Sequence, residues 1–287
     1  MAELETLIPD IHKLLNRLNN DEDIKAELAP HLPSFMAGVG EAVEHWATPQ
    51  IREKGSLRMS NIGKPDRQLW FDKNSEVEHE AEGDPVVQMR FLLGHILEQV
   101  ALLMIKSSGH TVTNEQGYAE VSGIKGSMDS VIDGEVVDIK TASPYAFKKK
   151  FKYGGLPDND EYGYLAQLAA YEESYGTDQG GFFAIEKASG EMALYRPEYL
   201  DKPNAKFRIK HLKDILELDT PPELCYPDQP EGTAGNMIMN SSCKFCKHKE
   251  ECRADTNDGS GLRKFQYSNG VKYFTKVIKE PRVEEIL

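Results

Sequence analysis

The stretch Gly126-Ser-Met-Asp-Ser-Val-Ile-Asp-Gly-Glu-Val-Val-Asp-Ile-Lys140 decides the central fold of this chain. Asp133-Gly134 separates two β-prone runs, and this dipeptide is a strong signal for a two-residue hairpin turn. Such a turn fixes the register of the two strands that it joins. It predicts three facing pairs, which are Ile132 with Glu135, Val131 with Val136, and Asp129 with Asp138.

One face of this hairpin concentrates charge, because side chains alternate along a strand. Asp129, Asp138 and Lys140 share that face, while the other face is apolar. Two carboxylates directly opposite each other lie roughly 5 Å apart, and like charges there are destabilising. A divalent cation between them would offset the repulsion, and carboxylate oxygens suit Mg²⁺ or Mn²⁺. The alternative interpretation is a surface hairpin with scattered charges.

A helix predicted over residues 84–106 carries a further candidate. Pro85 suits its first turn, and Gly94-His-Ile-Leu-Glu98 lies within it. Glu98 has apolar neighbours, and charged groups are rarely buried unless they are paired or bound to a metal. We therefore take Glu98 as a candidate third carboxylate, against the alternative of a partly exposed edge residue. His95 is a candidate ligand too, although a lone histidine is more often structural.

A second helix is predicted over residues 162–175, with Gln167 and Tyr171 on one face at positions i and i+4. That pair suits the orientation of a substrate phosphate or of a metal-bound water. The alternative is an ordinary amphipathic helix with a tyrosine in the core.

Between the hairpin and this helix lies Phe147-Lys-Lys-Lys-Phe-Lys-Tyr153, a basic run in a chain of net charge −13. The overall charge excludes a non-specific nucleic-acid coat protein, but it leaves room for a local basic patch. Lysines with interleaved aromatic residues suit a DNA backbone and stacked bases, whereas the alternative is a solvated charge run. The candidate DNA contacts are Lys148, Lys149, Lys150 and Lys152.

All four cysteines, Cys225, Cys243, Cys246 and Cys252, lie within a short segment. The N-terminus lacks a signal-peptide pattern and no apolar run approaches the length of a membrane span, so we expect a cytoplasmic protein without a membrane partner. Clustered cysteines in such a protein favour metal ligation over disulfides. Four thiolates suit either zinc or a [4Fe–4S] cluster, as a structural staple, with unliganded thiols as the alternative.

The remaining pattern predicts an α/β protein in three segments. These are an N-terminal helical region (1–58) with a break near Pro30 and Pro33, a core (59–220), and a Cys-rich module with a tail that packs on the core (221–287). An acidic loop is expected over 74–84. Strands are expected over 110–114, 126–132, 135–141, 181–185 and 191–195, and a further helix over 206–216.

The ordered series Gly94-x3-Glu98, Asp129, Asp138-Ile-Lys140 and Gln167-x3-Tyr171 resembles the PD-(D/E)XK nuclease superfamily, more narrowly its RecB-type exonuclease branch. Residues 160–167 and Cys243-Lys-Phe-Cys246 resemble the stand-alone exonucleases of bacteriophages. The resemblance runs from about Met59 to about Tyr273.

This resemblance implies a mixed sheet flanked by helices. It implies Glu98, Asp129, Asp138 and the Ile139 carbonyl as metal ligands, with Lys140 orienting the attacking water. Many relatives have histidine at the position of Glu98, a change of ligand type but not of role. One or two Mg²⁺ or Mn²⁺ ions would assist hydrolysis that leaves 5′-phosphates.

The run Cys243-x2-Cys246-x5-Cys252 resembles the three cysteines that close an iron–sulfur cluster in RecB-type relatives. Their first cysteine lies upstream of the core, in a stretch that corresponds to residues 59–70 here. That stretch has no cysteine, and Lys64 occupies the position. Cys225 would then supply the fourth ligand. The C-x2-C spacing does not separate iron–sulfur from zinc, and the resemblance of the x2, x5 run to those relatives favours iron–sulfur.

The leading hypothesis is a Mg²⁺- or Mn²⁺-dependent DNA exonuclease that acts on DNA with free ends. We expect it to be phage-encoded and to serve phage DNA replication, recombination or host DNA degradation in the host cytoplasm. One alternative is a non-catalytic module that binds DNA ends or a protein. Another is an endonuclease on the same core.

Overall fold

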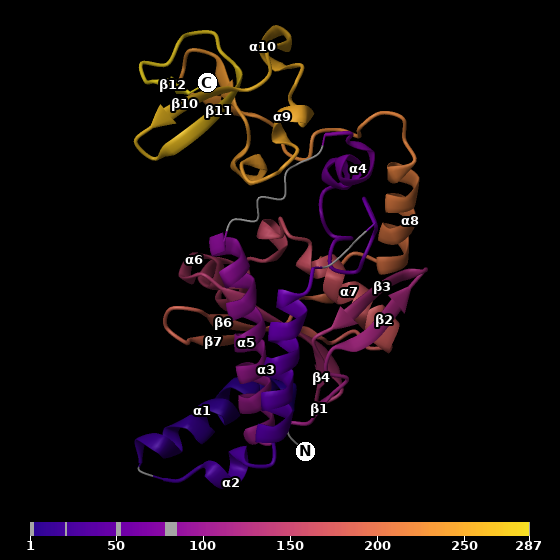
Figure 1. Cartoon of the computed structure of the whole chain (residues 1–287), viewed down its shortest axis with the longest axis vertical. Coiled ribbons are helices and arrows are strands. Elements are labelled where there is room, and N and C mark those ends of the chain that lie inside the picture. The colour runs from indigo at the N-terminus through magenta and orange to yellow at the C-terminus, as the bar shows by residue number, and fades with distance from the viewer. Residues whose placement is uncertain (1–2, 21, 50–52, 78–84, 287) are drawn as a thin grey trace. The chain divides into compact units, whose positions relative to one another are not determined.

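The computed structural model describes residues 3–20, 22–49, 53–77 and 85–286 (Figure 1). The chain divides into two compact units, Met1–Gly63 with Ala81–Lys213, and Lys64–Glu80 with Asp214–Leu287. This division differs from the three predicted segments, because the N-terminal helices pack in the same unit as the central sheet. The acidic loop expected over 74–84 lies largely outside the described residues.

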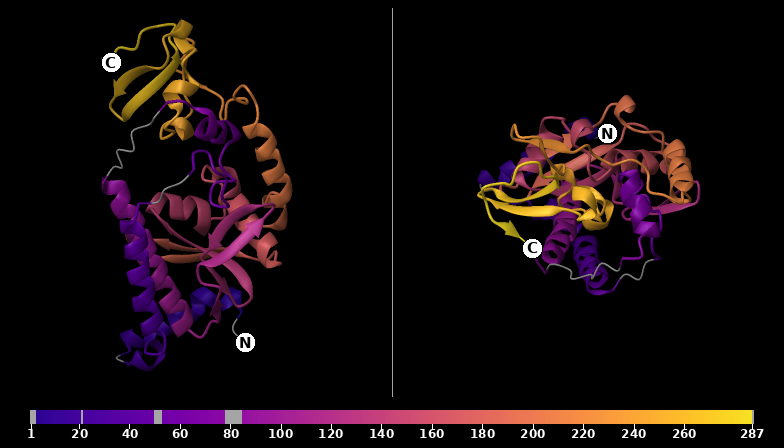
Figure 2. Two further views of the ribbon diagram at one scale, coloured as in Figure 1. Left: turned by 45° about the vertical axis from the view of Figure 1, so that its right-hand side comes forward. Right: turned by 90° about the horizontal axis from the view of Figure 1, so that it is seen from above.

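The helices of the first unit surround a mixed sheet. They are η1 (Leu4–Thr6), α1 (Leu7–Asn19), α2 (Lys25–Leu28), α3 (Leu32–Ala47), α5 (Pro85–Ser107), α6 (Pro144–Ala146), the π-helix η2 (Phe147–Lys152), η3 (Pro157–Asn159), α7 (Tyr164–Tyr175), η4 (Tyr199–Asp201) and α8 (Ala205–Leu216), which continues into the second unit. Helices α3 and α5 lie side by side (Figures 1 and 2). The break predicted near Pro30 and Pro33 is confirmed, because α2 ends at Leu28 and α3 begins at Leu32. Pro33 lies in the first turn of α3, where its missing N–H is harmless.

The sheet of this unit has the order β1-β4-β5-β6-β7. Its strands are β1 (Val112–Thr113), β4 (Ser130–Ile132), β5 (Glu135–Ala142), β6 (Gly181–Glu186) and β7 (Met192–Tyr195). Strands β5 and β6 run parallel, and the other neighbours run antiparallel. The predicted mixed sheet flanked by helices is confirmed.

The predicted hairpin register is confirmed over most of its length. Val131 pairs with Val136 and Ile132 with Glu135. Asp133 and Gly134 have φ values of 50° and 93°, as a type I′ turn requires.

The prediction of a single strand over 126–132 is wrong. It breaks at Asp129 into β3 (Ile124–Met128), which pairs with β2 (Gly117–Val121) in a separate sheet, and β4. The ladder between β4 and β5 ends at Ser130 and Val137, so Asp129 does not form the strand pair expected with Asp138. The change of sheet at this bend moves Asp129 out of the ladder.

An apolar core joins α1, α5 and the sheet. Full burial of a large aliphatic side chain stabilises the fold by about 1.5–3 kcal/mol. The buried members of this cluster are Leu4, Leu7, Ile11, Ala101, Leu102, Ile105, Ile132, Val137, Ile139, Phe183 and Ile185. The core therefore lies under the strand that carries Asp138 and Lys140.

The expectation that no apolar run approaches the length of a membrane span is wrong for helix α5. Within the described residues it is one helix that is long and apolar enough to cross a membrane by length and composition. Core helices of soluble proteins pass the same test, and the C-terminal half of α5 supplies Ala101, Leu102 and Ile105 to the core.

The second unit contains helix α4 (Asp66–Asn74) and a second sheet, of order β12-β10-β11-β9-β8, for which the sequence analysis named no strands. The strands are β8 (Gln229–Glu231), β9 (Asn236–Ile238), β10 (Arg263–Tyr267), β11 (Gly270–Lys276) and β12 (Glu285–Ile286). The short helices are η5 (Ser241–Cys243), α9 (Lys249–Cys252) and α10 (Thr256–Gly259).

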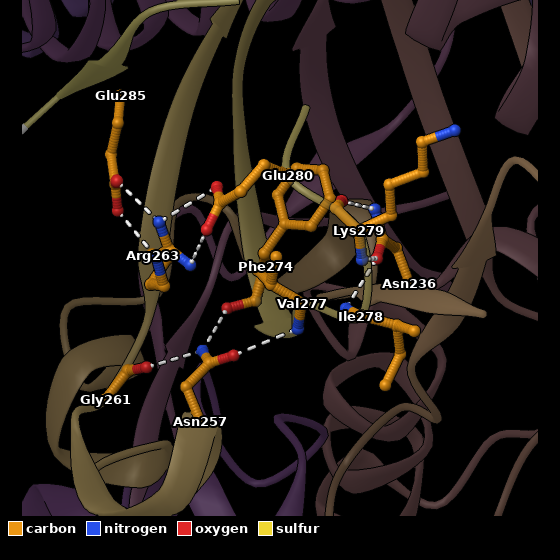
Figure 3. Close-up of polar contacts among 10 residues, drawn as sticks. All are labelled: Asn236, Asn257, Gly261, Arg263, Phe274, Val277, Ile278, Lys279, Glu280 and Glu285. Carbon is orange, nitrogen blue, oxygen red and sulfur yellow. Dashed lines mark hydrogen bonds and ion pairs between the residues drawn. The ribbon is translucent and has the colours of Figure 1, made fainter. Parts of the chain in front are cut away.

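Side-chain hydrogen bonds and ion pairs connect the strands and loops of this second sheet (Figure 3). Asn236 accepts from the backbone N–H groups of Ile278 and Lys279, and Asn257 donates to the carbonyl oxygens of Gly261 and Phe274. Arg263 forms ion pairs with Glu280 and Glu285. These contacts hold the irregular loops against the sheet, whose short strands bury few apolar residues.

Candidate active site

Three carboxylates from different elements of the first unit interact with one another. Asp138 lies on β5 and is 1% exposed, and Glu98 lies on α5 and is 9% exposed. Asp129 is partly buried at the bend between β3 and β4. The structure thus gathers the three carboxylates that the sequence singled out, although helix, bend and strand are far apart in the chain.

Their mutual repulsion is visible in their protonation. Burial, followed by the charge of Asp138, raises the pKa of Glu98 to about 7, while a hydrogen bond from Gln116 opposes this rise. Burial, Asp138 and Glu98 together raise the pKa of Asp129 well above its usual value. Without a compensating cation, the cluster therefore takes up protons near neutral pH.

Lys140 supplies a positive charge beside the carboxylates. Burial by itself would lower the pKa of Lys140, but Asp138 and then Asp129 raise it above its usual value. Its Nζ forms an ion pair with Asp138 Oδ2 and lies 4.9 Å from the centroid of the Tyr164 ring. Lys140 is therefore a permanently charged group at neutral pH.

The carboxylate of Asp138 is incompletely satisfied. Its buried Oδ1 has no hydrogen-bond partner among the described residues. A buried acceptor without a donor costs about 1–3 kcal/mol, and more when it is charged. A bound cation would remove this cost, so the donor set fits an oxygen-seeking divalent ion.

The side chains as they stand do not form a complete coordination shell. Within the described part of the chain, no three or more His, Cys, Asp or Glu side chains are arranged to hold a metal ion. The metal ligands named from the sequence, including the Ile139 carbonyl, therefore stay a prediction.

Gln116 is a site residue that the sequence reasoning missed. Its Nε2 donates to Glu98 Oε1 over 2.7 Å, its Oε1 accepts from Ser127 Oγ over 3.1 Å, and its backbone N–H donates to the Asp129 carbonyl over 3.1 Å. It thus connects two of the carboxylate-bearing segments. Its left-handed φ of 50° belongs to the turn from Asn114 to Gly117, and Asn at the first and Gly at the last turn position are the sequence signal that could have marked it.

Gln167 and Tyr171 share one face of α7, as predicted, because Gln167 Nε2 donates to Tyr171 Oη over 3.1 Å. Tyr171 is 2% exposed, and burial, together with the charge of Asp138, raises its pKa above the usual value. The phenol therefore stays protonated and lies within the electrostatic reach of Asp138.

His95 faces another histidine. Its ring meets His45 of α3 edge-on at 6.3 Å between centroids, and burial followed by His45 lowers its pKa. A neutral, partly buried ring against α3 fits the structural role that the sequence also allowed.

The basic run divides by burial. Lys150 is 7% exposed and pairs with Glu161 at 2.7 Å, because the π-helix η2 turns it inward with Phe147 and Phe151. Lys152 pairs with Glu191. Lys150 is therefore not suited to contact DNA, whereas Lys148, Lys149 and Lys152 are exposed and stay candidates.

The four cysteines of the second unit line one cavity of about 30 Å³, together with Arg67 and His248. They are free thiols, and Arg67 Nε donates to Cys252 Sγ over 3.0 Å. Burial raises the pKa of Cys225, of Cys246 and of Cys243, the last to about 11. The cysteines thus gather as the sequence predicted, while metal ligation stays a prediction.

No family model and no curated protein matches this chain. Among solved structures, the crystal structure of SSO0001 is similar with a TM-score of 0.38 and 17% identity, covering 78% of this chain and 91% of that one. The crystal structure of an alkaline exonuclease (LHK-Exo) from Laribacter hongkongensis is similar with a TM-score of 0.33 and 14% identity, covering 57% and 90%. The same enzyme in complex with dAMP gives 0.35 and 13%, with the same coverage.

Proposed function

We propose that this chain is a DNA exonuclease that depends on Mg²⁺ or Mn²⁺. The observation that carries the proposal is the buried group of Glu98, Asp129 and Asp138 beside Lys140, in which Asp138 Oδ1 has no hydrogen-bond partner in the described part of the chain. Buried charges that are not fully paired weaken a fold, so such a group is the kind that a functional site retains.

The cation would be held by Glu98, Asp129, Asp138 and the Ile139 carbonyl. When bound, a divalent ion polarises the scissile phosphate and lowers the pKa of a coordinated water. This assignment rests on the donor chemistry of the site and on the order of the motifs in the sequence.

The side chains of the site divide the remaining tasks. Lys140, charged at neutral pH, would hold the attacking water and stabilise the negative charge that develops on the phosphate. Glu98, whose pKa is about 7, would release its proton as the cation binds. Gln167 and Tyr171 would orient an oxygen of the scissile phosphate. Lys148 and Lys149 would bind the phosphate backbone of the DNA strand outside the cleavage site.

The cysteine segment would hold a structural metal centre. The resemblance of the run Cys243, Cys246 and Cys252 to that of RecB-type exonucleases supports a [4Fe–4S] cluster with Cys225 as fourth ligand. A single Zn²⁺ on the same four thiolates is the second candidate. A phage origin and a place in phage DNA replication, recombination or host DNA degradation in the host cytoplasm are supported by the sequence resemblance alone.

The experiment is digestion of end-labelled linear DNA with Mg²⁺ or Mn²⁺. Asp138→Ala and Lys140→Ala should abolish digestion, whereas Asp158→Ala and Lys210→Ala, at exposed positions, should retain it. Undiminished digestion by both site variants would overturn the proposal. Closed circular DNA should stay intact, since cutting would mean an endonuclease, and DNA binding without any digestion would mean a non-catalytic module.

A further inference from the structure

A pair of stacked tyrosines leads from Lys140 to the surface. Lys140 Nζ lies 4.9 Å from the centroid of the Tyr164 ring. The Tyr164 ring stacks on Tyr162 at 5.6 Å between centroids, with 27° between the planes. Tyr162 is 60% exposed. An aromatic surface open to solvent therefore begins two rings away from the proposed catalytic lysine.

The loop that carries Tyr162 is held on both sides. The carboxylate of Asp160 accepts from the backbone N–H groups of Tyr164 over 2.7 Å and Leu165 over 2.9 Å, which satisfies the start of α7. Gly163 has a φ of 76°, and a Cβ there would lie 2.2 Å from the backbone of Gly63. This close backbone contact leaves the loop little freedom.

Lys150 contacts the rings of both Tyr162 and Tyr164. Its Nζ lies 4.8 Å from the centroid of Tyr162 and 5.7 Å from that of Tyr164, within the range of cation–π attraction. Its ion pair with Glu161, the neighbour of Tyr162, holds the same loop. The lysine that the sequence assigned to the DNA backbone thus positions aromatic rings instead.

We propose that Tyr162 is a base-stacking subsite for an unpaired nucleobase next to the phosphate that is cleaved. A base offers a free π-face where it is unstacked, as in a single strand or at a duplex end, whereas bases inside a duplex are covered on both faces. Aromatic side chains bind such faces without regard to base identity. The subsite therefore selects a single-stranded or frayed DNA end, an inference that rests on the proposed nuclease function.

The arrangement explains why a rigid loop presents an apolar ring to water. Ordering a loop costs conformational entropy. Tyr162 contacts Tyr164 and Lys150, but 60% of it stays exposed and gains no contact in the free protein. A bound base would add contacts to this exposed surface, and a pre-positioned ring loses little conformational entropy when the base binds.

The first test compares steady-state kinetics on a short single-stranded oligonucleotide. Tyr162→Ala should raise KM by about 5- to 100-fold, with the larger part of the effect in KM rather than kcat, and Tyr162→Phe should behave as wild type. Tyr199→Ala is the matched control, because Tyr199 is 69% exposed on η4 of the same unit. An unchanged KM for Tyr162→Ala overturns the inference.

The second test reads stacking without catalysis. An oligonucleotide with terminal 2-aminopurine is added to the full-length Asp138→Asn protein, and stacking should quench its fluorescence. Adding Tyr162→Ala to that protein should abolish quenching, with an unchanged melting temperature showing that the fold persists. DNA digestion without Tyr162-dependent quenching overturns the inference alone. Quenching without any digestion by the wild type overturns the nuclease proposal alone.

Discussion

Asp129 Oδ2 accepts a 2.8 Å hydrogen bond from the backbone N–H of Ile139, the residue that follows Asp138. The regular pairing of β4 with β5 ends at Ser130 and Val137, and this bond continues the contact between the two segments at the next position. It ties the bend that carries Asp129 to the strand that carries Asp138 and Lys140. The carboxylate is thus held by a specific donor rather than by the regular ladder.

The buried carboxylates make stability depend on pH. The pKa of Glu98 is about 7 in the folded chain against 4.5 ordinarily, so the folded chain binds more protons than the unfolded chain between these values. The free energy of unfolding should therefore fall as pH rises from about 5 to 7.5, by on the order of 3 kcal/mol. Glu98→Gln should flatten this dependence, although Asp129 still contributes in the same direction. Denaturant titrations in EDTA measure it, and equal slopes for wild type and variant would contradict the assignment.

Mg²⁺ should reverse that loss of stability. A cation that binds only the folded chain adds about 2.7 kcal/mol at a concentration of 100 times its Kd. Thermal unfolding at pH 7.5 should therefore shift upward with Mg²⁺ or Mn²⁺ in the wild type, but not in Asp138→Asn. Asp158→Asn serves as the control and should keep the shift. A shift that persists in Asp138→Asn would place the cation elsewhere.

Gln116 should tune the protonation of Glu98. Its hydrogen bond lowers the pKa of Glu98, so Gln116→Ala should raise that pKa further. The acid limb of the pH–rate profile should move to higher pH, with reduced activity at pH 7 and recovery at more alkaline pH. Gln179→Ala, at an exposed position, is the control. Profiles of wild type and Gln116→Ala that run parallel would show that Gln116 acts only on stability.

Gly163 and Gly176 offer a matched pair for the loop before α7 and the end of that helix. Both have positive φ, 76° and 88°. A Cβ at Gly163 would meet the Gly63 backbone at 2.2 Å, whereas no atom of the described residues would lie within 4 Å of a Cβ at Gly176. Gly176→Ala should therefore cost about 1 kcal/mol for its backbone conformation, and Gly163→Ala distinctly more. Urea denaturation measures the two, and equal costs would mean that the contact with Gly63 yields easily.

Loss of one cysteine should release the proposed structural metal. Cys243→Ser should lower the bound metal to well under half of the wild-type content and destabilise the second unit. Analysis of anaerobically purified wild type for iron, sulfide and zinc identifies the centre. One zinc per chain without iron would end the iron–sulfur assignment, and absence of both metals would end the proposal of a metal centre. Ser242→Ala is the neighbouring control.

Features encoded by neighbouring residues were readable from the sequence. The Asp133-Gly134 turn set the hairpin register, because only residues that tolerate positive φ fit both central positions. The helical spacing of Gln167 and Tyr171 likewise predicted their contact. Both depend on chain geometry over a few residues, which composition and period determine without knowledge of the rest of the fold.

The tertiary structure alone decided which charges are buried and what they contact. Asp129 leaves the ladder because the chain changes sheets there, and Glu98 meets Gln116 from a distant turn. Lys150 points inward because a π-helix rotates it toward Glu161, which removes it from the basic surface. Burial and hydrogen bonding between distant segments set these roles, and no local periodicity encodes them. The carboxylates and Lys140 at the proposed site were thus named by sequence, while their protonation and their supporting contacts came from packing.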